Sequence, residues 1–119
     1  SGVAALDTWL ADLGRWEHEG DWRWTTRFAY QIIERRGTGG GGFRKMYAEF
    51  LEEAALADPR IAALGLPLLM AESARCWTAL AVVLKDSSES EYFPVEQLSE
   101  ALLSVRAAER RYCDAALTF

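Results

Sequence analysis

The chain has 119 residues, half of them hydrophobic, with 13 basic and 18 acidic side chains, one histidine and a net charge of −5. This composition supplies the core of one globular domain and excludes intrinsic disorder. The excess of acidic over basic residues argues against nucleic-acid binding, because a nucleic-acid binder needs basic side chains that neutralise the phosphates. No run of 18 apolar residues predicts a membrane span, so we expect no membrane association. Two cysteines and no asparagine suit the reducing cytoplasm, where we expect the protein.

Helix-forming residues dominate the sequence, and β-branched residues are sparse and scattered, so we expect an all-α fold without a sheet. Apolar residues recur at spacings of three and four over residues 3–18, which predicts an amphipathic first helix. Gly20 and Asp21 then supply a helix stop and an N-cap. A second helix is predicted over residues 22–36, and the two arginines at its end favour the negative pole of its dipole.

A run of glycines follows the second predicted helix. Four consecutive glycines cannot extend a helix without a large entropic cost, so residues 37–42 are predicted to form a loop. The helical period resumes at Phe43 and ends near Asp58, because the residue before a proline avoids the helical region. Residues 60–64 are compatible with a short additional turn.

The predicted central helix lies in the second half of the chain. Pro67 stands near its first position, and residues 67–85 are apolar on most sides, so we expect other helices to surround it. Residues 86–93 are rich in serine and glutamate and are predicted to form a solvated loop, after which Pro94 opens a last helix. The sequence thus predicts a compact bundle of about five helices in one domain, residues 1–119, with a glycine-rich loop between the second and third helices.

Gly37, Gly39 and Gly42 satisfy the spacing G-x-G-x-x-G of a dinucleotide-binding turn. That turn must follow a strand, whereas a helix precedes this one, so we expect no dinucleotide site. The phosphate loop of nucleotide hydrolases is also excluded, because Phe43 and Arg44 stand where it needs lysine and serine or threonine. We therefore expect no cofactor.

Two interpretations of the glycine-rich segment remain open. Its N–H groups, flanked by four basic residues, can receive a phosphate, a carboxylate or an acidic partner. Alternatively, the glycines let two helices pack closely, and Arg44 pairs with Glu34 or Glu49. Arg44 and Lys45 stand in the first turn of a helix, where the dipole disfavours positive charge, so some partner must compensate them. The candidate ligand- or partner-binding residues are Glu34, Arg35, Gly37, Thr38, Gly39, Gly40, Arg44 and Tyr47.

We expect neither a catalytic nor a metal-binding set. His18, the only histidine, ends the first helix, and Cys76 and Cys113 are interpreted as small buried hydrophobic residues rather than nucleophiles. One histidine and two separated cysteines lack the ligand spacing of a zinc site. The glutamates at 49, 52 and 53 lack the Glu-x-x-His pairs of a di-metal site, so we expect them on a solvated face.

Four tryptophans crowd the first two predicted helices. Trp9 and Trp16 share a face of the first helix, whereas Trp22 and Trp24 must lie on different faces of the second. One of the latter pair is therefore expected to face outward. An exposed tryptophan would mark a contact surface for another domain or subunit.

Residues 33–54 run IERRGTGGGGFRKMYAEFLEEA. This stretch resembles the helical C-terminal domain of unknown function in proteins similar to butirosin biosynthesis protein H, whose pattern runs roughly I-E-x-R-G-T-G-G-G-x-F-R-x-x-Y-x-x-F-L-x-E-A. An aromatic-rich first segment supports the resemblance, as do residues 76–81, which are similar to a tryptophan-centred later helix. The residues of this chain that match the family pattern are Glu34, Gly37, Thr38, Gly39, Gly40, Phe43, Arg44, Tyr47 and Phe50.

The resemblance implies a non-catalytic accessory or interaction domain, at the C-terminal end of a larger acyltransferase of bacterial secondary metabolism and antibiotic biosynthesis. It assigns the nucleophile and base to an N-terminal domain similar to cysteine peptidases, which moves an acyl group from a carrier protein to an amine. That domain or a homodimer partner is the expected contact, and an acyl carrier protein is a further one. The alternative is a module that binds an anion, such as phosphopantetheine, through residues 37–42 and Arg44.

Overall fold

The computed structural model of the chain describes residues 2–18, 21–34 and 41–119, and within these ranges it consists of helices without a strand. The helices are α1 (Gly2–His18), α2 (Trp22–Glu34), α3 (Gly41–Ala57), α4 (Pro59–Ala63), α5 (Leu66–Ser88) and α6 (Val95–Leu117). The predicted all-α fold is confirmed. The described residues form six helices rather than about five, because the short turn expected over residues 60–64 becomes α4.

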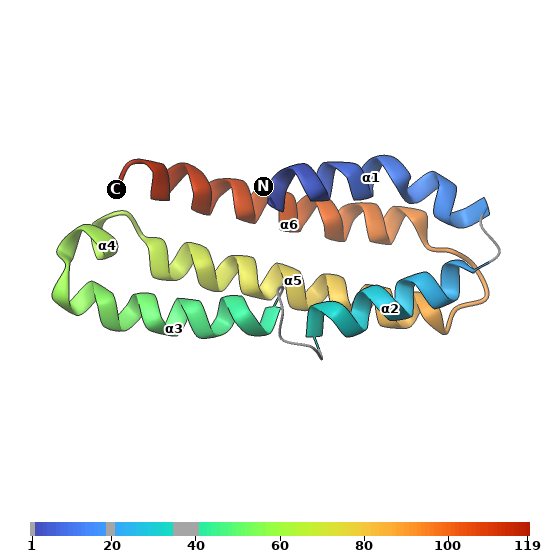
Figure 1. Ribbon diagram of the computed structural model, residues 1–119, viewed down its shortest axis with the longest axis horizontal. Coiled ribbons are helices and arrows are strands. Elements are labelled where there is room, and N and C mark those ends of the chain that lie inside the picture. Colours follow the sequence, from blue (N-terminus) through green and yellow to red (C-terminus); the bar gives the residue numbers. More distant parts are fainter. Residues whose placement is uncertain (1, 19–20, 35–40) are drawn as a thin grey trace.

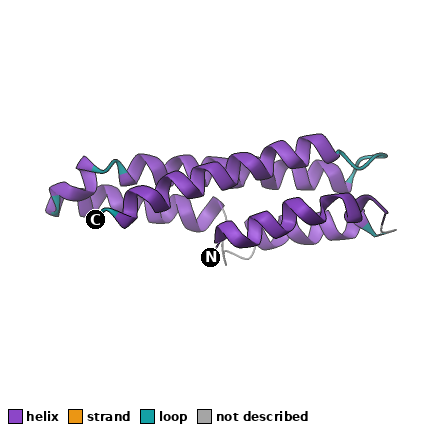
Figure 2. Cartoon of the chain, turned by 90° about the horizontal axis from the view of Figure 1, so that it is seen from above, coloured by secondary structure: helices purple, strands orange, loops and turns teal. Residues whose placement is uncertain are grey.

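The helices form an elongated bundle of 51 × 24 × 18 Å around α5 (Figure 1). The two long helices α5 and α6 run antiparallel, and α2 and α3 lie end to end along α5. Helix α1 covers only the N-terminal half of α6, as the view from above also shows (Figure 2). One half of the bundle therefore contains four helices, α1, α2, α5 and α6, whereas the other contains α3, α5 and α6 with the short α4.

Helix α5 occupies the centre, as the sequence predicts. Leu80, Ala81 and Leu84 of α5 are almost completely buried, and they pack against Leu98, Leu102 and Val105 of α6 in a core that also includes residues of α1 and α2. A second, smaller cluster joins Ala48 and Leu51 of α3 to Leu66 and Met70 of α5. By length and composition alone, α5 is the one helix among the described residues that could cross a membrane. The core helix of a helical bundle meets the same criteria of length and composition.

Two predicted helix boundaries are wrong. Helix α3 begins at Gly41, so Gly41 and Gly42 are helical rather than part of a loop, while residues 37–40 lie outside the described residues. Each glycine in a helix costs about 0.5–1 kcal/mol of conformational entropy relative to alanine, a cost that the packing of the rest of α3 can offset. Helix α5 continues to Ser88 instead of ending near residue 85, because the hydroxyls of Ser87 and Ser88 donate to the carbonyls of Val83 and Lys85 and are satisfied within the helix.

The turns around α4 use the predicted signals. The Asp58 side chain caps α4 by accepting a hydrogen bond from the backbone N–H of Arg60 at 3.0 Å, and Pro59 occupies the first turn. The Arg60 guanidinium also donates to the Asp58 carboxylate, which holds the pKa of that carboxyl below its ordinary value. Gly65 then turns the chain into α5 with φ +67°, a conformation that strains any residue with a Cβ.

The core assignment predicts a strong contrast between two leucine truncations. Leu80→Ala should lower the free energy of unfolding by about 2–5 kcal/mol, because Leu80 is fully buried and its truncation leaves a cavity. Leu117→Ala makes the same chemical change at a largely exposed position and should stay within about 0.5 kcal/mol of wild type. Urea unfolding monitored by circular dichroism measures both. Equal losses in the two variants would contradict the assignment of α5 as the core helix.

Candidate functional site

Few of the predicted binding residues lie where the structure describes their side chains. Arg35, Gly37, Thr38, Gly39 and Gly40 lie outside the described residues, and Glu34 ends α2 with a side chain that is likewise outside the description. Arg44 and Tyr47, both on α3, are described together with their contacts. The candidate site is therefore built from these two residues outward.

Arg44 forms an ion pair with Glu109 of α6. Only 20% of the Arg44 side chain and 9% of the Glu109 side chain are exposed. Helices α3 and α6 lie on different sides of α5, with no pair of described Cα atoms within 8 Å, so the two long side chains span the distance between them. The positive charge predicted to need compensation at the start of α3 is thus compensated by a carboxylate of the protein.

Trp77 of α5 completes the cluster between the two charges. Its indole Nε1–H donates to Glu109 Oε1 at 2.7 Å, and the Arg44 guanidinium carbon lies 4.8 Å from the centroid of the Trp77 ring. The tryptophan thus supplies a hydrogen bond to the anion and a π face to the cation. Each charge therefore receives more than one stabilising contact, as burial of an ion pair requires.

Tyr47 and Tyr112 form a second polar contact between α3 and α6. Burial, together with the charge of the neighbouring Tyr47 and a side-chain hydrogen bond to it, raises the pKa of Tyr112 to about 12. Both tyrosines lie one helical turn or less from the ion pair, Tyr47 three residues after Arg44 and Tyr112 three residues after Glu109. Arg44 and Tyr47 therefore both connect α3 to α6 through their side chains.

Glu109 is a site residue that the sequence marks through its place on the apolar stripe of α6. Glu109 lies between Val105 and Tyr112 at spacings of four and three, so it stands on the apolar stripe of its helix. A carboxylate on a buried stripe requires a partner. The identity of that partner, 65 positions away, depends on how the helices pack and could not be read from local pattern.

The remaining expectations concern the thiols and the acidic residues. Cys76 is half-buried and burial raises its pKa, whereas Cys113 is exposed, so the prediction of a buried Cys113 is wrong. Glu49, Glu52 and Glu53 are exposed, as expected of a solvated face. Among the described residues, no three histidine, cysteine or carboxylate side chains are grouped as metal ligands.

The contacts of the ion pair predict an energetic coupling between its residues. Glu109→Gln should lower the free energy of unfolding by about 1–3 kcal/mol, because it leaves the Arg44 charge half-buried without its carboxylate. Arg44→Met should also destabilise, but the double variant should be more stable than the sum of both losses predicts. Urea denaturation of the wild type, the two single variants and the double variant measures the coupling. Glu96→Gln, which changes an exposed carboxylate on the same helix, is the control. Additive losses would contradict the coupling.

The raised pKa of Tyr112 predicts a loss of stability at alkaline pH. The folded state keeps this phenol neutral to about pH 12, while an unfolded tyrosine ionises near pH 10. This contribution to stability is therefore complete below about pH 10 and lost as the pH rises to about 12. Unfolding midpoints measured between pH 8 and 11.5 should fall more steeply for wild type than for Tyr112→Phe. Parallel curves would contradict the assignment.

Comparison with known protein families finds a match over nearly the whole chain. A family described as a domain of unknown function, DUF4872, matches residues 1–116. No curated protein and no solved structure matches the chain. Because the match covers nearly the whole length, the chain belongs to the DUF4872 family.

Proposed function

We propose that the chain is a non-catalytic accessory domain of a larger acyltransferase similar to butirosin biosynthesis protein H, acting in bacterial secondary metabolism. In this proposal it docks on the N-terminal catalytic domain of the same protein through the aromatic surface of α2. The resemblance of residues 33–54 to the corresponding domain of those proteins supports a parent protein of this kind, and membership of a family of unknown function is compatible with it. The exposed aromatic face of α2 supports docking as the way in which the domain acts.

The observation that carries the proposal is an exposed pair of stacked rings. The Trp24 and Phe28 ring centroids lie 5.1 Å apart with their planes 5° from parallel, and Trp24 is 65% exposed. Trp22, the other candidate, is instead buried against the edge of Phe93 at a centroid distance of 5.4 Å. Rigid, partly preorganised aromatic side chains of this kind supply much of the binding energy of protein interfaces.

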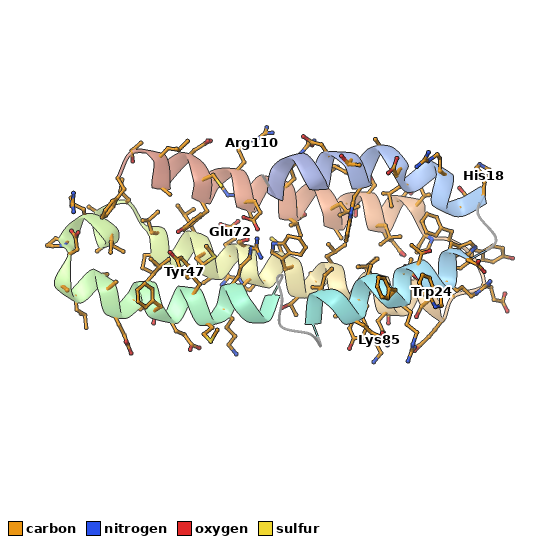
Figure 3. All side chains as sticks on the ribbon, viewed as in Figure 1. His18, Trp24, Tyr47, Glu72, Lys85 and Arg110 are labelled. Atoms are coloured by element: carbon orange, nitrogen blue, oxygen red, sulfur yellow. The ribbon has the colours of Figure 1, made fainter. Side chains whose placement is uncertain are left out.

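The surroundings of the stacked rings also fit a docking surface. Arg27 and Gln31 line a shallow depression of about 300 Å³ together with the two rings, so polar groups surround an apolar centre. The helix that carries them is fixed, because the Arg23 guanidinium donates to the carbonyl oxygens of Ser90 and Glu91 in the connection between α5 and α6. Trp24 lies in the half of the bundle opposite Tyr47 (Figure 3).

The alternative, an anion site formed by residues 37–42 and Arg44, is less favoured. The Arg44 guanidinium already contacts the Glu109 carboxylate and the Trp77 ring, so an incoming phosphate would have to compete with a buried anion. The contacts of Arg44 and Tyr47 with other helices instead support a structural role for residues 33–54, the stretch that resembles the known domain.

The proposal predicts the effect of one truncation on domain binding. Trp24→Ala should weaken the affinity of the isolated domain for the N-terminal domain of its parent protein by at least thirtyfold, which corresponds to about 2 kcal/mol. Isothermal titration calorimetry measures the affinity. Tyr92→Ala removes another exposed aromatic ring, outside α2, and should leave it unchanged. Equal affinities for the wild type and the Trp24 variant, or no binding by wild type, would overturn the proposal.

A further inference from the structure

The depression on the outward face of α2 contains one charged group. Its lining consists of the rings of Trp24 and Phe28, the Gln31 amide and the Arg27 guanidinium. Arg27 follows Trp24 by three residues and precedes Gln31 by four, so these side chains share one face of the helix. No carboxylate of the described residues lines this depression, and the charge of Arg27 has no counter-charge within it.

Arg27 also lacks a carboxylate partner elsewhere in the ranges that the structure describes. The ion pairs of those ranges involve Arg15, Arg44, Arg60, Arg106 and Arg111. One turn before Arg27 on the helix stands Arg23, and like charges four residues apart repel each other. The exposed Arg27 guanidinium is therefore stabilised by water.

The two other cations near this face have contacts of their own. The Arg23 guanidinium donates to two backbone carbonyl oxygens of the connection between α5 and α6. The Lys85 ammonium lies 5.9 Å from the centroid of the Tyr30 ring, and Asp86 lines the same small depression between α2 and α5. Within the described part of the chain, Arg27 is thus the cation of this face that lacks a partner.

A partner that docks on the aromatic surface of α2 covers Arg27 as well as the rings. Arg27 lines the same depression as Trp24 and Phe28, so a partner that excludes water from the rings also removes water from the guanidinium. The loss of water from a charge opposes binding strongly unless a counter-charge replaces it. Since the described residues supply none, the partner must bring an anion.

We infer that the partner of this surface presents an aspartate or glutamate side chain to Arg27, beside an apolar group that covers the stacked rings. The inference rests on the proposed docking through α2 and names the chemistry of the partner. A guanidinium binds a carboxylate through two parallel N–H···O hydrogen bonds. The Gln31 amide, one turn further along the helix, offers another N–H donor to the same partner.

The charges of the chain favour a protein carboxylate over the phosphates of a nucleic acid or a membrane. A nucleic acid binds through several cations that neutralise successive phosphates, and an anionic bilayer attracts clusters of basic residues. Among the described residues, this face offers one cation without a partner, on a chain of net charge −5. A single acidic side chain matches that arrangement.

A series of substitutions at Arg27 tests the sign and the geometry of the contact. Isothermal titration calorimetry measures the binding of each variant to the N-terminal domain of the parent protein. Arg27→Gln should raise Kd at least about thirtyfold, because it leaves the partner's carboxylate covered and unpaired. Arg27→Glu should raise Kd further, since two carboxylates then face each other. Arg27→Lys keeps the charge but loses the paired hydrogen bonds, so its Kd should lie between those of wild type and Arg27→Gln.

Arg110→Glu is the matched control for charge. Arg110 is an exposed arginine of α6, on the side of the bundle away from α2 (Figure 3). Its reversal changes the net charge as much as Arg27→Glu does and should leave Kd unchanged. Because Arg27 is exposed, each Arg27 variant should keep the circular dichroism spectrum and the melting temperature of the wild type.

The outcomes separate the carboxylate contact from the docking on which it rests. Equal affinities for wild type and the Arg27 variants, with weaker binding by Trp24→Ala, would overturn the contact and leave the docking intact. Tighter binding by Arg27→Glu would reveal a basic partner and overturn the contact as well. So would phosphatidylglycerol vesicles that retain the wild type but not Arg27→Glu, because the surface would then bind a membrane. A wild type that does not bind the N-terminal domain would overturn both proposals.

Discussion

The buried contact between Arg44 and Glu109 is the interaction on which the three-helix half of the bundle depends. The backbones of α3 and α6 are too far apart for close helix packing, so longer side chains make the contacts between them. Taking two charges out of water costs free energy, and the indole of Trp77 offsets part of that cost through its N–H and its ring. Because Arg44 of α3 contacts both Glu109 of α6 and Trp77 of α5, the cluster connects all three helices at one level of the bundle.

The position of α3 determines what lies on each side of that helix. With Arg44 directed toward α6, Tyr47 follows one turn later and meets Tyr112. Ala48 then faces α5, and Lys45, Glu49 and Glu52, which share that side of α3, lie exposed beside the alanines of α5. The internal polar contacts and the external charge pattern are thus two consequences of one helix orientation.

Local pattern predicted most of the fold but only part of the site. Apolar spacing located the helices and the central position of α5, and the adjacency of Trp22 and Trp24 predicted one exposed ring, which is Trp24. The predicted loop start at residue 86 failed because Ser87 and Ser88 bond to carbonyls of their own helix. The Arg44–Glu109 pair could not be predicted, since its residues meet only after three helices have packed.

The basic residues at the start of α3 suggested an anion site from the sequence, and the structure divides them into two different roles. Arg44 points inward and is engaged by a carboxylate of the same chain, whereas Lys45, the next residue, is exposed beside Arg75. Successive residues on a helix differ by about 100°, so two adjacent cations cannot share one ligand as readily as residues three or four apart. The inward charge therefore connects α3 to the rest of the bundle, whereas the outward charge is exposed to solvent.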